Sequence, residues 1–237
     1  MQKETFVLKK IDYRKLGLFI PVICIVLMGM IVMKKPSEIV VSVSTTAISN
    51  KTAERPKKIA LTFDDGPHPR YTEQILDGLA ERNVKATFFV LGRNIKGNED
   101  IIKRIQDEGH LIGNHSYDHV RLASLRLETA CEELNKTNQC IYDITGVYPI
   151  YVRPPFGEWR KGLDCKTNMI PVLWTVDSKD WQLKNADKIV KNVVKKVTEG
   201  DIILMHDWYN TSVTAAMRIV DELQKQGYDF VTVDELI

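Results

Sequence analysis

Five short stretches of the sequence carry acidic, imidazole or guanidinium side chains in arrangements that could do chemistry. An Asp-Asp-Gly-Pro run starts at Asp64, and two histidines, His115 and His119, lie four residues apart. Imidazole and carboxylate groups are the common ligands of zinc-like metals, and imidazole is also suited to proton transfer near neutral pH. The five stretches are residues 62–67, 115–119, 153–157, 177–181 and 204–207.

Each stretch taken alone has an ordinary structural explanation. The Asp-Asp-Gly run is typical of a turn, because Asp bonds its own backbone and Gly adopts positive φ. If residues 115–119 form one helical turn, both imidazoles face the same way and could share a metal. Arg153 before two prolines could be a rigid turn with a solvated charge, and His206 or Trp181 could belong to the core. A functional site therefore requires a fold that brings the five stretches together.

Strand and helix patterns alternate from Lys57 onward, which predicts an α/β domain with a parallel sheet. Seven strands of this kind can close into a barrel, and the five polar stretches follow strands at the end where such barrels do chemistry. The expected strands are 58–63, 86–90, 111–113, 150–152, 171–175, 202–205 and 230–233. The expected helices are 72–83, 101–108, 122–144, 186–196 and 214–226.

In this order, the five stretches resemble the motifs of the polysaccharide deacetylases of carbohydrate esterase family four, also called the NodB homology domain. The resemblance covers residues 57–237, and residues 227–233 resemble the family's closing strand. It implies a distorted (β/α) barrel with about seven parallel strands, fewer than the eight-fold type. It also implies an enzyme that hydrolyses acetyl groups on a polysaccharide.

The resemblance assigns one divalent metal ion to Asp65, His115 and His119. Zinc suits this donor set best, and cobalt or nickel could also bind. Asp64 would be the general base, held and ionised by Arg153, since two adjacent carboxylates repel unless each has a partner.

The same resemblance makes His206 the general acid that protonates the departing amine. Asp180 would orient His206, with Asp177 the less favoured candidate. A backbone N–H near Phe156 would complete the oxyanion pocket. The predicted substrate-binding residues are Pro155, Phe156, Trp181 and Leu204, of which the last two would form a slot for the acetyl methyl. Phe156 departs from the family, which commonly has Tyr there, and this puts a sugar contact by a hydroxyl in doubt.

An uncharged apolar run from Leu16 to Met33 precedes the domain. As a helix it would be roughly 27 Å long, close to the hydrocarbon core of a membrane. More basic residues lie before it than after it, which predicts a cytoplasmic N-terminus at 1–15, a transmembrane signal-anchor at 16–33 and a linker at 34–56. The catalytic domain, 57–237, would lie outside the cell. A cleaved signal peptide with secretion is the main alternative, and a buried core helix is the lesser one.

Composition excludes some other classes. Thirty-three basic and 31 acidic residues leave a net charge of +2, which gives no basic excess for binding nucleic acid. Cys131 and Cys140 lie on one expected helix roughly 13 Å apart, too far for a disulfide. A bridge from Cys165 to either of them stays open. We expect a monomer.

The sequence therefore predicts amide hydrolysis on N-acetylglucosamine or N-acetylmuramic acid units, with release of acetate. The predicted membrane anchor favours peptidoglycan, the cell's own envelope, over chitin. Two alternatives stay open: hydrolysis of O-acetyl esters, as in xylan-type members of the family, and a catalytically silent wall-binding module. A zinc peptidase is disfavoured because the chain has no His-Glu-x-x-His motif.

Overall fold

The computed structural model describes residues 56–160, 163, 165 and 169–237. The predicted segments 1–15 and 16–33, and all of 34–56 except Pro56, lie outside these residues. Within the described part of the chain, no helix has the length and apolar character needed to cross a membrane.

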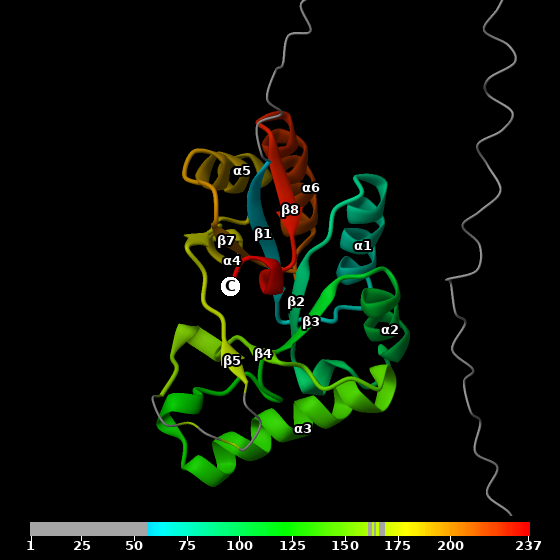
Figure 1. Cartoon of the computed structure of the whole chain (residues 1–237), viewed down its shortest axis with the longest axis vertical. Coiled ribbons are helices and arrows are strands. Elements are labelled where there is room, and N and C mark those ends of the chain that lie inside the picture. Colours follow the sequence, from blue (N-terminus) through cyan, green and yellow to red (C-terminus); the bar gives the residue numbers. More distant parts are fainter. Residues whose placement is uncertain (1–55, 161–162, 164, 166–168) are drawn as a thin grey trace, which may run out of the picture. The chain divides into compact units, whose positions relative to one another are not determined.

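One parallel sheet forms the centre of the domain (Figure 1). Its order is β5-β4-β3-β2-β1-β7-β6, and β8 pairs with β1 on a separate stretch. Strand β1 lies inside the sheet, and its residues from Ile59 to Phe63 are buried, as in a strand covered on both faces. All of them are apolar except Thr62, whose hydroxyl donates to the Ile203 carbonyl. The strands are β1 (Lys57–Asp64), β2 (Thr87–Val90), β3 (Leu111–Asn114), β4 (Tyr151–Val152), β5 (Ile170–Pro171), β6 (Val176–Asp177), β7 (Ile202–His206) and β8 (Tyr228–Val231).

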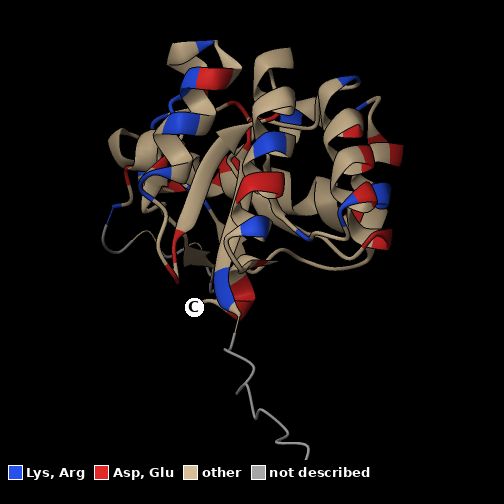
Figure 2. Ribbon diagram, turned by 90° about the horizontal axis from the view of Figure 1, so that it is seen from above, with Lys and Arg blue, Asp and Glu red and all other residues tan. Residues whose placement is uncertain are grey.

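Amphipathic helices cover the outside of the sheet (Figure 1). Apolar residues at helical spacing form their buried faces, for example Ile75, Leu76 and Leu79 in α1. Neighbouring helices contact one another in the order α5, α6, α1, α2 and α3. Figure 2 shows Lys and Arg interspersed with Asp and Glu on these helices, so charges of both signs share this face. The helices are α1 (Tyr71–Glu81), α2 (Glu99–Asp107), α3 (Leu127–Thr145), α4 (Asp180–Leu183), α5 (Ala186–Val194) and α6 (Asn210–Lys225).

Strands β5 and β6 are the two ends of one extended segment, residues 170–177. The Val172 N–H donates to the Val152 carbonyl at 2.8 Å, and the Thr175 N–H donates to the Ile202 carbonyl at 3.0 Å. The segment thus passes from the β4 edge of the sheet to the β7 edge, and the sheet curls into a half-barrel. Counted as one strand it gives the predicted seven. The prediction of a continuous strand at 171–175 was wrong, because pairing occurs at the two ends of the segment and not along its middle.

Two other predicted elements differ in extent. The long helix expected from Leu122 begins as a 3₁₀ turn, η3 (Leu122–Ser124), and α3 starts only at Leu127. The Ser124 hydroxyl donates to the Arg121 carbonyl at 2.8 Å, a local bond that competes with helix continuation. Strand β8 ends before Val233, whose N–H donates to the Thr87 hydroxyl at 3.1 Å and so leaves the ladder.

A disulfide joins α3 to the chain that follows β4. Cys131 and Cys165 are bonded, with their Cα atoms 5.1 Å apart, and Cys140 is free. Both bonded cysteines belong to a small apolar cluster with Leu122, Leu134 and Val152. Of the two pairings that the sequence left open, the structure has the one with Cys131.

The double substitution C131A/C165A should lower the free energy of unfolding by about 2–4 kcal/mol, because the bridge closes a loop of 34 residues in the unfolded chain. Urea denaturation with and without a reducing agent measures this difference. The variant C140A keeps the bridge and should stay sensitive to the reducing agent. A wild-type denaturation midpoint that is the same with and without the reducing agent would contradict the Cys131–Cys165 disulfide.

Candidate active site

A cleft of about 420 Å³ opens at the C-terminal ends of the strands. All five predicted stretches contribute to its lining. Because the strands are parallel, their C-terminal ends meet at one edge, and the register places Asp64 of β1 directly beside His206 of β7. The lining residues from the predicted set are Asp64, Asp65, His115, His119, Phe156, Trp181, Leu204 and His206.

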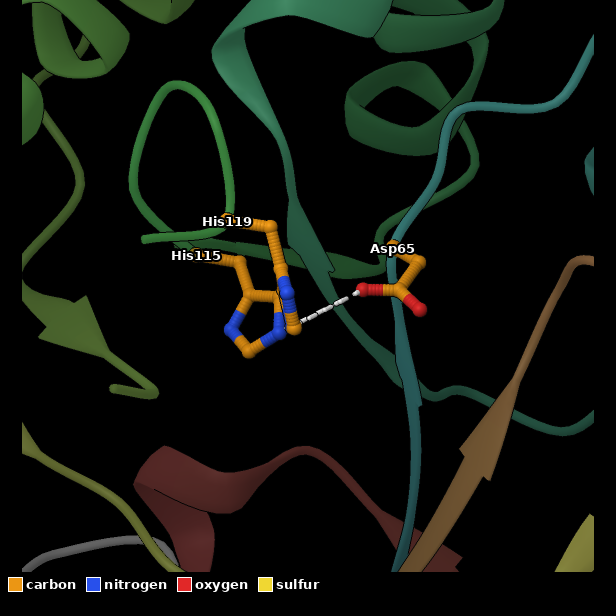
Figure 3. A group of neighbouring side chains, drawn as sticks. All are labelled: Asp65, His115 and His119. Atoms are coloured by element: carbon orange, nitrogen blue, oxygen red, sulfur yellow. Dashed lines mark ion pairs between the residues drawn. The ribbon is translucent and has the colours of Figure 1, made fainter. Parts of the chain in front are cut away.

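Asp65, His115 and His119 form a compact group of possible metal ligands (Figure 3). One ligand atom from each lies within 4.8 Å of the others. Nε2 of His115 and Nε2 of His119 are 3.5 and 3.6 Å from Asp65 Oδ1, and that oxygen is buried without a hydrogen bond. Such a group fits a single divalent cation, which would give the buried oxygen a partner.

The charge state of Asp65 also suits a cation. Burial alone would raise the pKa of Asp65, but the nearby imidazoles, His115 above all and then His206 and His119, lower it to about 2. The carboxylate is therefore ionised across the physiological pH range, as a metal ligand must be.

The two histidines lie on a loop after β3 and not on a helical turn. Ser116 and His119 have φ of 68° and 58°, in the left-handed region. The Ser116 hydroxyl accepts from the His119 N–H at 3.0 Å and holds this bend. Nδ1 of His115 lies 2.6 Å from the Arg153 carbonyl. Since a carbonyl can only accept, Nδ1 carries the proton and Nε2 keeps its lone pair toward Asp65.

Arg153 is completely buried and holds Asp64. Its Nη1 donates to Asp64 Oδ1 at 2.8 Å and to the Thr62 hydroxyl at 2.6 Å. Its Nε and Nη2 donate to the carbonyls of Val172 and Leu173 at 3.2 and 3.3 Å. These two carbonyls belong to the segment that crosses between the sheet edges. The guanidinium therefore pairs the Asp64 charge and also satisfies the backbone of the crossing segment.

Asp180 orients His206. Its Oδ1 lies 2.8 Å from His206 Nδ1, and its Oδ2 accepts from the His206 N–H at 2.8 Å and from the Ser212 hydroxyl at 2.6 Å. Burial would lower the pKa of His206, but the hydrogen bond and charge of Asp180, with the charges of Asp64 and Asp65, raise it to about 9. The imidazole is therefore protonated at neutral pH, with Nε2 left for a further partner.

Asp177, the alternative partner for His206, has another role. Its Oδ1 accepts from the Lys179 N–H at 2.7 Å, which holds the turn into α4, while its side chain lines the cleft. Burial raises the pKa of Asp180, but its bonds to His206 outweigh burial and lower it. Asp180, and not Asp177, is therefore the hydrogen-bond partner of His206.

Three of the four predicted substrate-binding residues lie at the cleft. Phe156 and Trp181 are 54% and 49% exposed at the cleft, and Leu204 lines its floor. Pro155 does not line the cleft. It is buried in the 3₁₀ turn η4 (Pro155–Gly157), and Pro154 faces the cleft in its place. Phe156 has φ of 62°, and its ring meets the His119 ring edge-on at 4.8 Å.

Two residues that the sequence reasoning missed also belong to the site. Trp174 lines the cleft, but the sequence placed it inside a buried strand. Thr62 bridges Arg153 and the Ile203 carbonyl, to which its hydroxyl donates at 2.7 Å. A polar residue in an apolar strand two positions before Asp64 was the available signal for Thr62.

Comparison with known proteins relates the chain to deacetylases that act on polysaccharides. Residues 51–168 match the family model described as polysaccharide deacetylase. The chain is 41% identical over 184 residues to the peptidoglycan-N-acetylglucosamine deacetylase PgdA of Listeria monocytogenes. The aligned residues make up 78% of this chain and 40% of that protein. It is 37% identical to a peptidoglycan-N-acetylglucosamine deacetylase of Bacillus cereus, over 76% of this chain and 88% of that protein.

The structure is similar to a solved one. Peptidoglycan deacetylase PdaC of Bacillus subtilis superimposes with a TM-score of 0.75 at 42% sequence identity, over 77% of this chain and 90% of that chain. The chain thus spans about 40% of the length of the Listeria relative but nearly all of the solved domain.

The substitution R153M should lower the free energy of unfolding by about 3–5 kcal/mol, because Asp64 would be left buried without a counter-charge. The double variant D64N/R153M should recover part of this loss, since it buries no unpaired charge. Urea denaturation measures both. As a control, R126M removes a guanidinium that is 87% exposed and should change stability by less than about 0.5 kcal/mol. Equal destabilisation by R153M and R126M would contradict the account of Arg153.

Proposed function

Because the chain belongs to the polysaccharide deacetylase family, we propose that it hydrolyses N-acetyl groups from an N-acetylated cell-wall polysaccharide and releases acetate. We propose peptidoglycan as the polysaccharide, with N-acetylglucosamine or N-acetylmuramic acid as the unit attacked. The observation that carries the proposal is the meeting of three metal-ligand side chains, a paired carboxylate and a paired imidazole in one cleft.

Asp65, His115 and His119 would hold the divalent ion, and we propose zinc, although cobalt or nickel suits the same donors. When bound, such an ion polarises a carbonyl and lowers the pKa of water. The family uses a divalent metal, and the orphaned Asp65 Oδ1 supports this use here.

Asp64 is the proposed general base. Arg153 occupies Oδ1 of this carboxylate, and Oδ2 lies 3.7 Å from His115 Nε2, on the side of the metal ligands. Oδ2 is thus the oxygen placed to accept a proton from the attacking water. The ion pair with Arg153 fixes the orientation of Asp64, so that little reorganisation is needed during the reaction.

His206 is the proposed general acid. Asp180 binds its Nδ1, which leaves the protonated Nε2 to donate to the departing amine. The backbone N–H near Phe156 would stabilise the developing oxyanion, and Trp181 with Leu204 would enclose the acetyl methyl. Asp64 is paired with Arg153 and Asp180 with His206, and these different partners separate the roles of the two carboxylates.

We also propose that residues 16–33 anchor the chain in the cell membrane, with residues 57–237 outside and acting as a monomer. The uncharged run and its basic N-terminal flank support the anchor. A cleaved signal peptide would instead release the domain. Mass analysis of the N-terminus of the purified membrane fraction tests the choice, because a cleaved chain would lack residues 1–33.

Full-length protein should release acetate from purified peptidoglycan glycan strands, lose this activity after chelation and regain it with zinc. The variant D64N should keep its bound metal and lose about 10²–10⁴-fold in rate, because the base is absent. Acetylated xylan in a parallel reaction tests ester hydrolysis. If folded, zinc-loaded wild-type protein releases no acetate from the glycan, the proposal is overturned. If that protein still binds the glycan, the catalytically silent wall-binding module is favoured.

The variant D180N should move the basic limb of the kcat/KM profile to lower pH by about 1–2 units. The general acid works only when protonated, and Asp180 is the main group that raises the pKa of His206 to about 9. Without that charge, His206 loses its proton at a lower pH. D177N is the matched control, because Asp177 bonds the Lys179 N–H and should leave the limb in place. An unmoved limb in D180N would show that His206 is not the acid.

A further inference from the structure

An aromatic cluster lies beside the cleft but outside its lining. It is formed by His68, Tyr71 and Trp208. The His68 ring is 4.4 Å from the Tyr71 ring and 4.9 Å from the Trp208 ring, which it meets edge-on at 85°. Trp208 is 42% exposed.

The cluster joins the two loops that carry the proposed base and acid. Asp64 and His206 are register partners on β1 and β7, and the loops that follow them contain His68 and Trp208 respectively. Trp208 is only two residues beyond the proposed acid. A chain of sugars with one unit at His206 could therefore extend toward this cluster of His68, Tyr71 and Trp208, which we call the shelf.

Hydrogen bonds hold the shelf rigid before any ligand binds. Nδ1 of His68 accepts from the N–H groups of Arg70 and Tyr71 at 3.1 and 3.2 Å, which fixes the ring. The His68 N–H donates to the Thr72 hydroxyl at 2.7 Å, and that hydroxyl donates to Asp207, the residue before Trp208. A pre-positioned ring loses little conformational entropy on binding, which favours its use as a contact surface.

A close backbone approach makes the same connection between the loops. A Cβ built on Gly66 would lie 2.2 Å from Asp207 Oδ2, so only glycine lets the two loops pack this tightly. The shelf is therefore a built feature of both loops. Trp208 contacts the His68 ring, and 42% of the residue stays exposed to solvent.

We propose that Trp208, braced by His68, is a stacking platform for a sugar unit adjacent to the unit whose acetyl group is in the cleft. The C–H groups on one face of a pyranose ring are apolar and match an exposed aromatic face. Continuity with the cleft selects the polysaccharide itself as the occupant. The inference rests on the proposed function, and it adds that recognition extends over more than one sugar.

The test compares N-acetylglucosamine oligomers of two and six units on full-length, zinc-loaded protein. W208L should lower kcat/KM for the hexamer about tenfold, mostly through KM, and for the dimer less than about twofold. W208F keeps an aromatic face and should retain most of the preference for the hexamer. Y148L is the matched control, because Tyr148 is an exposed aromatic residue stacked on Tyr142 outside the cleft lining.

Equal losses for dimer and hexamer, or no loss for either, would overturn the inference. Calorimetric binding of the hexamer to wild type and W208L decides the question separately from catalysis. A weaker Kd in W208L supports the platform even if no acetate is released, a result that would count against the proposed function alone. An unchanged Kd overturns the platform even if the enzyme is active, and thermal melting checks that each variant is folded.

Discussion

The guanidinium of Arg153 lies buried between the proposed base and the backbone that completes the half-barrel. One group pairs the charge of Asp64 and satisfies the carbonyls of Val172 and Leu173 in the crossing segment. A buried charge without a partner costs several kcal/mol, so neither the carboxylate nor the guanidinium could occupy this place alone. The proposed catalytic charge and the closure of the sheet therefore depend on the same ion pair.

The division of labour between Asp64 and Asp65 follows from this pair. The two carboxylates are adjacent in sequence, and as neighbours with the same charge they would repel one another if both lacked partners. Asp64, at the end of β1, points to Arg153, whereas Asp65, at φ of 77°, points to His115 and His119. The turn at Asp65 thus sends two identical side chains to two different partners. A single strand end supplies both the proposed base and a metal ligand.

The sequence predicted the features that depend on pattern. Alternating apolar runs and helical faces located most strands and helices, and the polar residues after the strands located the cleft. Features that depend on hydrogen bonds between distant parts of the chain could not be predicted from the sequence pattern. The 171–175 segment is apolar up to Thr175, and nothing in its pattern says that it changes partner strand in the middle. His115 and His119 have the spacing of a helical turn, but the bond from the His119 N–H to Ser116 forms a loop. The Cys165 pairing was likewise open until the chain positions around α3 were known.

The central claim is that Asp65, His115 and His119 share one metal ion. X-ray absorption at the zinc edge, on full-length protein with one equivalent of zinc, tests it most directly. The account predicts a first shell of nitrogen and oxygen at about 2.0–2.2 Å, two of the ligands being imidazoles. The variant H119A should show one imidazole fewer. A sulfur ligand at about 2.3 Å, or a spectrum of hydrated zinc with no imidazole, would contradict the account.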